Sequence, residues 1–414
     1  MSARPLRVLH LSSLYPPHIV GGAERSVSML AEAQAAAGWA VAAACLSPDT
    51  AHEEVRNGVR VFRMPHGNNF WLEDWPNHGQ RAREWAKFKQ QANFGIERRF
   101  GAVIDQFRPD IVNTHSLVDI STRVWHAAKR RGVPIVHTLR DFDLLCAASS
   151  MFRETGPCQH RHLKCQVLTF AKQFDQRLVS GVTAVGSEVL ARHLQFGFFD
   201  HVPETQRRVI WNTARVEGVD DTYVRPPRTG PLTLGYLGRI SPEKGVDVLL
   251  RAVRHLPASG WRLLIAGTAP GDLAPFQRLA EKLPVEFIGF QAPKQLFDQI
   301  DVLVAPSLWA EPLGRTVLEA YQAGVPVIGS RSGGIAEIIQ DSDWLVEPGD
   351  VPGLAKRLQR LMAGERPGPP AGRARVMART TPEAVAQGFA EIYATVLGPQ
   401  SATARTRSAA LAGQ

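Results

Sequence analysis

The two halves of the sequence open with the same order of local patterns, and this repetition restricts the fold more than any other feature. The first half begins with the apolar run LRVLHL, a loop with two glycines, a helical pattern that ends at Gly38, and the apolar run VAAACLS. The second half repeats this order with LTLGYL, a loop, VDVLLRAVRHL and WRLLIAG. Alternating strands and helices with short links indicate parallel sheets that are covered by helices on both faces. The sequence therefore predicts two related α/β domains.

Further short apolar runs are predicted to be buried parallel strands, and they lie at 111–115, 134–139, 181–186, 285–289, 302–307 and 325–330. A chain of 414 residues exceeds one ordinary core, which agrees with two domains. The predicted division is 1–205 for the first domain, 206–380 for the second, 381–398 for a final helix, and 399–414 for a small, polar tail that is expected to be disordered.

Loops that follow strands carry the chemistry of an open α/β sheet, because ligands bind beyond the carboxyl ends of the strands. The first such loop contains Gly21 and Gly22 and opens a helix. Glycines let a backbone approach a ligand closely, and a helix start offers N–H groups to an anion. An ordinary turn is the alternative for so short a motif. Ser332-Gly333-Gly334, after the predicted strand 325–330, offers another close approach.

The first loop of the second half, GRISPEKG, places Arg239 and Lys244 on either side of a turn. Two cations at the carboxyl end of a strand, beside a helix start, suit a diphosphate group. The alternative is that both side chains are solvated surface residues.

The stretch AEPLGRTVLEA follows the predicted strand 302–307 and begins a helix. The backbone N–H groups of Gly314, Arg315 and Thr316 are expected to point into the cleft between the domains. Glu311 and Glu319 flank this helix start. One carboxylate could accept hydroxyl groups of a sugar and the other those of a ribose, whereas the alternative makes them a capping residue and a surface residue.

These motifs together resemble the retaining glycosyltransferases of family 4, which have the GT-B fold. The resemblance rests on GGAE, the GRxxxxKG turn, the E-x7-E spacing from Glu311 to Glu319, GVPVIGSRSGGIAEII and LVEPGD. It covers 232–362 almost continuously and is patchier in the first half. It implies an α/β protein with two Rossmann-like domains that face each other across a central cleft, and a C-terminal helix that crosses back to the first domain.

The resemblance implies that the second domain holds most of a nucleotide-diphosphate sugar. Arg239 and Lys244 would bind its diphosphate, helped by the N–H groups near Gly314. Glu319 would bind the ribose, and Glu311 would bind hydroxyl groups of the donor sugar.

The resemblance assigns further contacts to other loops. Gly21 and Gly22 would close over the phosphates from the first domain, and His115, which ends IVNTH, would reach the donor sugar. Contacts to the base are expected near Gly267 and Phe290. The residues expected to take part in catalysis are His115, Glu311, Arg239 and Lys244.

The reaction that the resemblance implies is transfer of a sugar to a saccharide or lipid-linked acceptor in polysaccharide or glycolipid assembly. Its transition state has oxocarbenium character and its leaving group is an anionic diphosphate, so positive charge and helix dipoles lower the barrier. The family mechanism is a front-side displacement in which the leaving phosphate helps to deprotonate the acceptor. No metal ion and no further cofactor is expected.

The sequence departs from the family pattern after the predicted strand 134–139. Arg140 stands where relatives often have a histidine, and an arginine does not titrate near neutral pH, which puts an acid–base role there in doubt. Asp141-Phe142-Asp143 resembles the DxD metal motif of another glycosyltransferase fold and is interpreted as structural or acceptor-side.

The segment that follows contains three of the four cysteines, and its histidines could complete a metal site. Cys146, Cys158 and Cys165 have no CxxC pair, and one cysteine of the pairs usual in relatives is missing. Reduced structural thiols are the expectation, and a zinc site is the alternative.

The net charge of +9 suits an anionic partner, because the excess of Lys and Arg lies in the first 200 residues and after Lys356. An arginine-rich protein without such a partner is the alternative. The basic, aromatic segment 83–100 is predicted to form one amphipathic helix that either contacts an anionic membrane, receives a lipid-linked acceptor, or packs in the ordinary way. No apolar run is long enough for a transmembrane helix, and the first one, Val8 to Leu14, is too short and too polar for a signal peptide, so a cytoplasmic protein is expected, with peripheral contact at the inner membrane face as an option.

Three other classes of protein fit the sequence less well. A nucleotide-sugar epimerase of the same fold is disfavoured by the E-x7-E and GRxxxxKG motifs. A nicotinamide-dependent dehydrogenase would need a GxGxxG loop, which GGAERS does not match. A nucleic-acid-binding protein is disfavoured by the acidic 201–355 segment, so no nucleic-acid partner is expected.

Overall fold

The computed structural model describes residues 4–19, 21–153, 156–220, 222–340, 342–367 and 373–398. The predicted tail at 399–414 lies outside these residues. The chain divides into two compact units, which are described separately. Unit 1 contains the chain up to Met151, Gln159–Thr213 and the chain from Pro382, and unit 2 contains Phe152–Cys158 and Ala214–Thr381.

Unit 1 is built on an eight-stranded sheet with the order β10-β9-β6-β5-β1-β2-β4-β3. Every pair of neighbours is parallel except β3 and β4, which are antiparallel. The strands are β1 (Arg7–Leu11), β2 (Ala40–Ser47), β3 (His52–Arg56), β4 (Val59–Pro65), β5 (Ile111–His115), β6 (Ile135–Leu139), β9 (Gly181–Ala184) and β10 (Arg207–Val209). In register, Leu9 of β1 lies opposite Ala42 and Val112.

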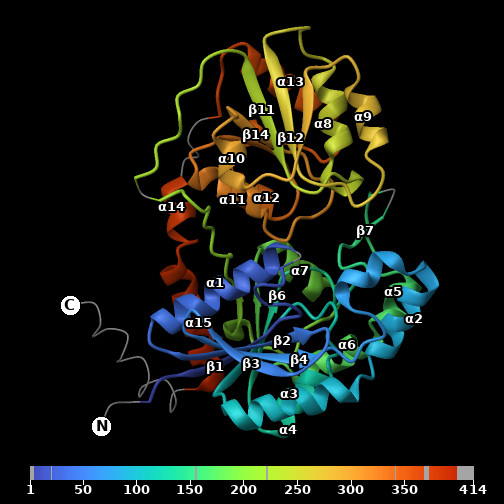
Figure 1. The fold of residues 1–414 in the computed structure, drawn as a ribbon, viewed down its shortest axis with the longest axis vertical. Helices are drawn as coiled ribbons and strands as arrows, with labels where there is room; N and C mark the ends of the chain where they lie inside the picture. The colour runs from blue at the N-terminus through green and yellow to red at the C-terminus, as the bar shows by residue number, and fades with distance from the viewer. Residues whose placement is uncertain are drawn as a thin grey trace. The chain divides into compact units, whose positions relative to one another are not determined.

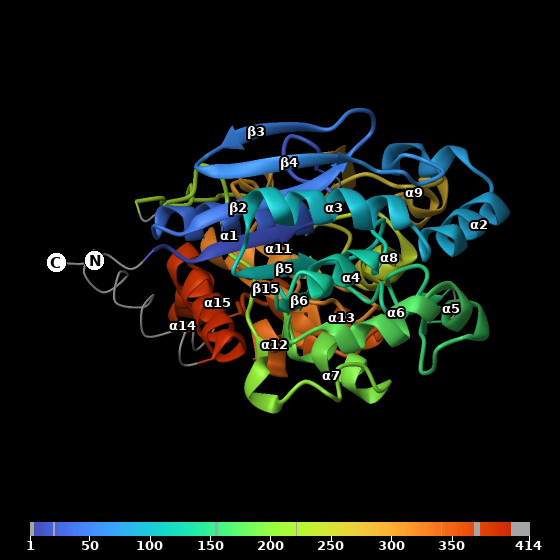
Figure 2. The same ribbon diagram turned by 90° about the horizontal axis from the view of Figure 1, so that it is seen from below.

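Helices cover both faces of this sheet, as the alternating pattern predicts. Figures 1 and 2 show α1 and α15 together on one face and α3 and α4 together on the other. The helices of unit 1 are α1 (Gly22–Ala36), α2 (Gln80–Gln90), α3 (Phe94–Phe107), α4 (Arg123–Arg130), α5 (Leu163–Leu168), α6 (Phe170–Asp175), α7 (Ser187–Gln195) and α15 (Pro382–Leu397).

The C-terminal helix α15 packs into unit 1, which confirms the expected return of the chain to the first domain. Its residues Phe389, Ile392 and Tyr393 are buried in one core with Val8 and Ile111 of the sheet. A helix that buries this many large side chains is held to the sheet by its apolar face.

The prediction of one helix over 83–100 is wrong. Helix α2 ends at Gln90 and α3 begins at Phe94. The side chain of Asn93 accepts a hydrogen bond from the N–H of Ile96 at 3.0 Å, so it caps the start of the second helix. Helical spacing of aromatic and basic residues continues across this break, and therefore it did not reveal the break.

Unit 2 is built on a six-stranded, fully parallel sheet with the order β13-β12-β11-β14-β15-β16. The strands are β11 (Leu232–Leu237), β12 (Trp261–Ala266), β13 (Val285–Gly289), β14 (Val302–Ala305), β15 (Val327–Ser330) and β16 (Leu345–Val346). Two short strands, β7 (Phe152–Arg153) and β8 (Gly156–Pro157), form a separate pair.

A large core lies on this sheet, with buried side chains from β11, β12 and three helices, α8, α9 and α13. The helices of unit 2 are α8 (Val246–Val253), α9 (Ala274–Ala280), α10 (Pro293–Phe297), α11 (Arg315–Gln322), α12 (Gly334–Ile339), α13 (Val351–Met362) and α14 (Arg373–Ala378). Among all the helices within the described ranges, none is both long and apolar enough to cross a membrane.

Candidate active site

The loops of unit 2 that contain predicted site residues all lie at one edge of the sheet. Since its strands are parallel, the loops that follow them gather at their carboxyl ends. The strand order places the loop after β11, with Arg239 and Lys244, between the loop after β12 and the loop after β14, which contain Gly267 and Glu311. The next strand, β15, is followed by Gly333.

The turn before α8 touches the loop after β14 at a distance that only glycine allows. Gly245 has a φ of +69°, and a Cβ atom there would lie 1.9 Å from the carbonyl oxygen of Pro306. The N–H groups of Leu308 and Trp309 both donate to the carbonyl oxygen of Glu243, at 2.9 and 3.2 Å. These contacts set the position of Lys244 relative to the loop that contains Glu311.

Lys244 and Glu311 form an ion pair, with Nζ 2.5 Å from Oε1. The ammonium group also lies over the ring of Trp309, 4.9 Å from its centre. The hydroxyl of Ser307 donates to the same Glu311 oxygen at 3.2 Å. Both charged side chains are mostly buried, with 19% and 13% of their surface exposed. The structure therefore brings together the cation predicted for a diphosphate and the acid predicted for a sugar.

Arg239 has a different environment from Lys244. Its side chain is 60% exposed, and its Nη2 lies 3.8 Å from Oε1 of Glu243. Its carbonyl oxygen accepts a hydrogen bond from the hydroxyl of Tyr236 at 2.5 Å. Burial raises the pKa of Tyr236, and the negative charges of Glu311 and Glu243 raise it further, so Tyr236 stays a neutral donor.

Helix α11 begins directly beside Glu311. Gly314 precedes it with a φ of +79°, which favours glycine, and Arg315 and Thr316 form its first turn. The first N–H groups of a helix have no acceptor within the helix, so this end carries partial positive charge. Glu319, one turn later, accepts a hydrogen bond from Nε of Arg315 at 2.7 Å and is 6% exposed. The two glutamates therefore pair with different cations.

The glycines after β15 support the backbone of Glu311. The N–H of Gly334 donates to the carbonyl oxygen of Glu311 at 2.8 Å. Gly333 has a φ of +52°, and a Cβ atom there would lie 2.2 Å from the same oxygen. The close approach expected at this loop is thus made to a neighbouring loop of the protein.

Gly267 and Phe290 follow the neighbouring strands β12 and β13. A Cβ atom on Gly267 would lie 1.8 Å from the carbonyl oxygen of Gly238, so only glycine fits beside the loop that contains Arg239. The N–H of Gly267 donates to the carbonyl oxygen of Gly289 at 2.7 Å. The ring of Phe290 is 74% exposed.

In unit 1, Gly21 and Gly22 lie at the start of α1, as expected from the sequence. The N–H of Gly21 donates to the Glu24 carboxylate at 2.9 Å, so the side chain of the helix itself caps this end.

His115 is fully buried at the end of β5 and belongs to a chain of hydrogen bonds. Nε of Arg140 donates to its Nδ1 at 3.2 Å, so its proton is on Nε2, which faces Nδ1 of His10 at 2.9 Å. His10 in turn donates from Nε2 to Gln34 at 2.8 Å. Burial, with the charge of Arg140, holds the pKa of His115 well below its usual value and lowers that of His10 to about 4. Both imidazoles are therefore neutral.

Sequence reasoning missed His10 and Gln34. The signal for His10 is a polar residue inside the first apolar strand, but its partners lie 24 and 105 residues away. Arg140, which the sequence singled out as a departure, is the residue that sets the protonation of His115.

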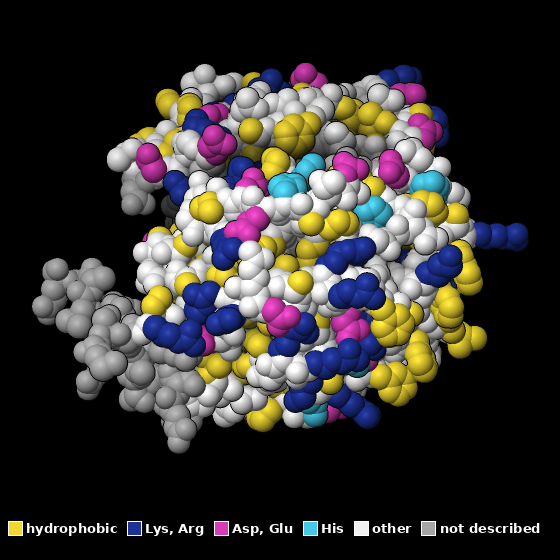
Figure 3. Space-filling model, turned by 60° about the horizontal axis from the view of Figure 1, so that its bottom comes forward, with side chains coloured by type: hydrophobic (Ala, Val, Ile, Leu, Met, Phe, Trp, Pro, Cys, Tyr) yellow, Lys and Arg dark blue, Asp and Glu magenta, His cyan; other side chains and the backbone are white. Residues whose placement is uncertain are grey.

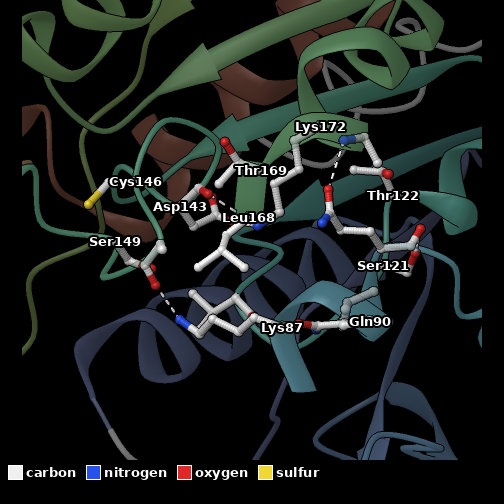
Figure 4. A pocket seen from close by; sticks show the side chains of 15 residues that line it. Lys87, Gln90, Ser121, Thr122, Asp143, Cys146, Ser149, Leu168, Thr169 and Lys172 are labelled. Atoms are coloured by element: carbon white, nitrogen blue, oxygen red, sulfur yellow. Dashed lines mark hydrogen bonds and ion pairs between the residues drawn. The ribbon is translucent and has the colours of Figure 1, made fainter. Parts of the chain in front are cut away.

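The loops after β5 and β6 form a polar pocket with α2 and α6 (Figure 4). Its volume of about 20 Å³ is large enough for one water molecule. Lys172 reaches across it to the Asp143 carboxylate at 2.8 Å, and Lys87 donates to the carbonyl oxygen of Ala147. Sequence reasoning missed Lys172, because no local motif marks it.

The pKa values of Asp141 and Asp143, the DxD-like residues, shift in opposite directions. Burial and the charge of Asp143 raise the pKa of Asp141 well above its usual value, and its carboxyl contacts the hydroxyl of Ser116. Burial would also raise the pKa of Asp143, but the ammonium of Lys172 outweighs this and lowers it. In the part of the chain that is described, His, Cys, Asp and Glu nowhere form a group of three that could hold a metal ion.

Cys146 has an unusual environment for a buried thiol. A hydrogen bond with Cys165, together with backbone N–H groups from Ala148, Met151 and Ser150, lowers the pKa of Cys146 to about 5. No disulfide joins Cys146, Cys158 and Cys165.

Two family models match the chain. Residues 231–364 match the model for "Glycosyl transferases group 1", and residues 21–213 match the model for "Glycosyl transferase 4-like domain". Together the models include the site loops of unit 2 and most of the sheet of unit 1. The chain belongs to the GT-B glycosyltransferases of the family 4 type.

Relatives and solved structures agree with this membership. A 42.6 kDa protein from the cps region of Klebsiella pneumoniae is 25% identical, over 85% of this chain and 96% of its own length. Sucrose-phosphate synthase of Thermosynechococcus elongatus has a TM-score of 0.70 at 21% identity, over 94% of this chain and 98% of its own. HepE of Anabaena, in complex with UDP and glucose, has a TM-score of 0.65 at 18% identity, over 94% and 99%. The structural similarities establish the fold.

Proposed function

We propose that this glycosyltransferase moves a sugar from a nucleotide-diphosphate sugar to a hydroxyl group of a saccharide or lipid-linked acceptor, with retention of the anomeric configuration. The contact between Lys244 and Glu311, beside the start of α11, carries the proposal. It joins a group that can bind phosphate to a group that can bind hydroxyls. The complex of HepE with UDP and glucose supports the choice of donor class.

The ion pair neutralises two charges within a mostly buried site, since Glu311 balances the charge of Lys244. A diphosphate would offer Lys244 a stronger, doubly charged partner. The Glu311 carboxylate would then be free to accept hydroxyl groups of the donor sugar.

The same groups would stabilise the leaving diphosphate. As the glycosidic bond to the leaving oxygen breaks, negative charge grows on the phosphate. Lys244, the exposed guanidinium of Arg239 and the positive end of α11 would all lie at the developing charge. The proposal thus assigns leaving-group stabilisation to the protein, without a metal ion or a further cofactor.

Glu319 would bind the ribose, with Arg315 holding its carboxylate in place. Gly267 and Phe290 would lie near the base, on the neighbouring strand ends. Gly21 and Gly22 would meet the phosphates from unit 1. His115 would reach the donor sugar by exchanging one of its ring contacts, to Arg140 or to His10, and it would do so as a neutral group because its pKa lies well below its usual value.

Thermal-shift measurements with UDP-, GDP- and ADP-sugars test the donor class, and the Lys244→Ala and Glu319→Ala variants test the site. We expect one nucleotide series to stabilise the protein. Each variant should lower donor affinity or turnover at least about tenfold, or about 1.4 kcal/mol. The matched control is Lys356→Ala, which removes an exposed lysine from α13 and should change neither quantity. Absence of stabilisation by every nucleotide sugar and nucleoside diphosphate would count against the donor class, and unchanged kinetics in both variants would reject the site.

A further inference from the structure

Three neighbouring helices of unit 1 expose large apolar side chains, which we call the α2–α5–α6 surface. The exposed fractions are 55% for Trp85, 48% for Phe88, 77% for Leu163, 47% for Val167, 61% for Phe170 and 51% for Phe174. Scattered apolar residues on a surface are normal, but a contiguous group marks a contact site.

The helical spacing of these residues places them on common faces. Leu163 and Val167 are four residues apart on α5, and Phe170 and Phe174 are four apart on α6. The rings of Phe170 and Phe174 lie 4.8 Å apart, and those of Trp85 and Phe88 are stacked at 5.8 Å. Each helix therefore presents a paired apolar face to its surroundings.

Polar contacts hold the three helices side by side. The side chain of Gln91, just after α2, donates to the carbonyl oxygen of Val167 at 3.2 Å. The oxygen of the same amide accepts the N–H of Ala171 at 2.9 Å. Lys164 of α5 pairs with Glu84 of α2. The exposed side chains thus belong to one continuous surface.

These apolar side chains do not pack into the hydrophobic core. No residue of α5 or α6, both of which are described in full, is buried. A short helix that gives no side chain to the core gains little from apolar residues unless something else covers them. The inner sides of α2 and α6 line the pocket in Figure 4, so this surface and the pocket share their walls.

Basic side chains accompany the apolar residues. Arg81, Arg83 and Lys89 of α2 are exposed. Nζ of Lys89 lies 5.4 Å from the centre of the Trp85 ring, so this lysine lies beside the apolar side chains. The acid Glu84 is neutralised by Lys164. Figure 3 shows hydrophobic side chains at the right edge of the molecule with Lys and Arg side chains beside them.

We propose that the α2–α5–α6 surface binds the surface of an anionic lipid bilayer. Aromatic and aliphatic side chains would enter the interfacial region, and the basic side chains would reach the phosphate groups beside it. The combination of exposed aromatic rings and one sign of charge fits this partner. The inference deepens the proposed function, since it brings the enzyme to lipid-linked acceptors, but binding to vesicles does not depend on the donor.

Co-sedimentation with vesicles tests the proposal, using phosphatidylglycerol mixed with phosphatidylcholine and, in parallel, phosphatidylcholine alone. We expect the full-length protein to bind the anionic vesicles more tightly and to release them as salt increases. The double variant Phe170→Ser and Phe174→Ser should bind at least about tenfold more weakly, because it removes two insertable rings. Arg81→Glu combined with Lys89→Glu should weaken binding to the anionic vesicles and leave binding to the neutral ones unchanged.

The control is Val224→Ser, which removes an 84% exposed apolar side chain from unit 2 and should not alter vesicle binding. Unchanged melting temperatures and unchanged donor binding would show that the variants remain folded. Equal vesicle binding by the wild type and both double variants would overturn the proposal. The proposal would also be overturned if the wild type were a dimer that does not bind vesicles and the Phe170→Ser and Phe174→Ser double variant were a monomer. The surface would then be an interface between copies of the chain.

Discussion

Lys244 and Glu311 illustrate what single residues reveal in a sequence. Both could be picked out because each follows a predicted strand within a motif of fixed spacing. Their direct contact could not be predicted, since it depends on the approach of the Gly245 turn to Pro306, across 61 residues of sequence. The relay from Arg140 to Gln34 escaped prediction for the same reason, because it joins two strands and a helix through side chains with no local pattern.

Buried neutral histidines make the stability of unit 1 depend on pH. Burial lowers the pKa of His10 and of His193 to about 4, and that of His137 to about 3, from 6.5. Between pH 6.5 and 4 the unfolded chain binds protons that the folded chain does not. Stability should therefore fall as the pH drops across this window, by about 1.4 kcal/mol per pH unit for each histidine.

The variant His193→Phe isolates one of these contributions. In the wild type, the imidazole of His193 is stacked against the ring of Phe142, with the ring centres 6.1 Å apart, and lies beside Phe198 and Phe199. A phenyl ring therefore suits the position. Urea unfolding at several pH values gives the free energy of unfolding as a function of pH. Between pH 6.5 and 4 this free energy should fall less steeply for the variant than for the wild type, by about 1.4 kcal/mol per pH unit. Parallel slopes for the two proteins would contradict a neutral, buried His193.

At the level of elements, apolar runs predicted strands both inside a sheet and at its edge. The predicted strands at 111–115 and 285–289 coincide with β5, which is fully buried, and with β13, an edge strand that has no buried residue although burial was expected for it. β3 was not predicted, because HEEVR is polar and lies at the sheet edge, where one antiparallel neighbour suffices. The break between α2 and α3 depends on the Asn93 cap, which a periodicity of apolar and basic residues does not register.

The order of the strands could not be obtained from the sequence either. The sheet of unit 1 places β1 between β2 and β5, and that of unit 2 places β11 between β12 and β14. Short apolar strands carry little information about their neighbours, because nearly any pair of them can form a parallel ladder. The sequence did predict that the functional loops gather at the carboxyl ends of the strands, because this follows from parallel strands alone.

Helix α15 offers a test at this scale through one buried hydrogen bond. The Tyr393 hydroxyl donates to Oδ1 of Asn113 on β5 at 2.7 Å, and both residues are fully buried. Tyr393→Phe should lower the free energy of unfolding by about 1–3 kcal/mol, because the Asn113 oxygen would lose its partner. Thr395→Ala on the same helix is the control, since Thr395 is exposed, its hydroxyl donates to the carbonyl oxygen of Ile392, and its loss should cost far less. Equal effects of the two substitutions would show that α15 is not held by this bond.

On the scale of the whole molecule, each unit has its own hydrophobic core. Unit 2 is organised around the strands from β11 onward, and unit 1 around β1 with α1 and α15. A ligand bound mainly by unit 2 should therefore slow amide hydrogen exchange in that unit, and the slowing can be measured segment by segment. The site loops after β11 and β14 are the parts expected to respond first, because they contain Lys244 and Glu311.

Hydrogen–deuterium exchange resolves this effect, using whichever of UDP, GDP and ADP belongs to the nucleotide series that stabilises the protein. At about 100 times its dissociation constant, a ligand adds about 2.7 kcal/mol to the stability of the state that binds it. We expect exchange to slow in 238–245 and 307–316, and in the first turn of α11, with little change in the strands of unit 1. Lys244→Ala should abolish this protection and Lys356→Ala should preserve it, because only the first removes a group from the site. Protection that appeared in unit 1 and spared these loops would move the nucleotide to the other half of the chain and refute the assignment of Lys244 and Glu319.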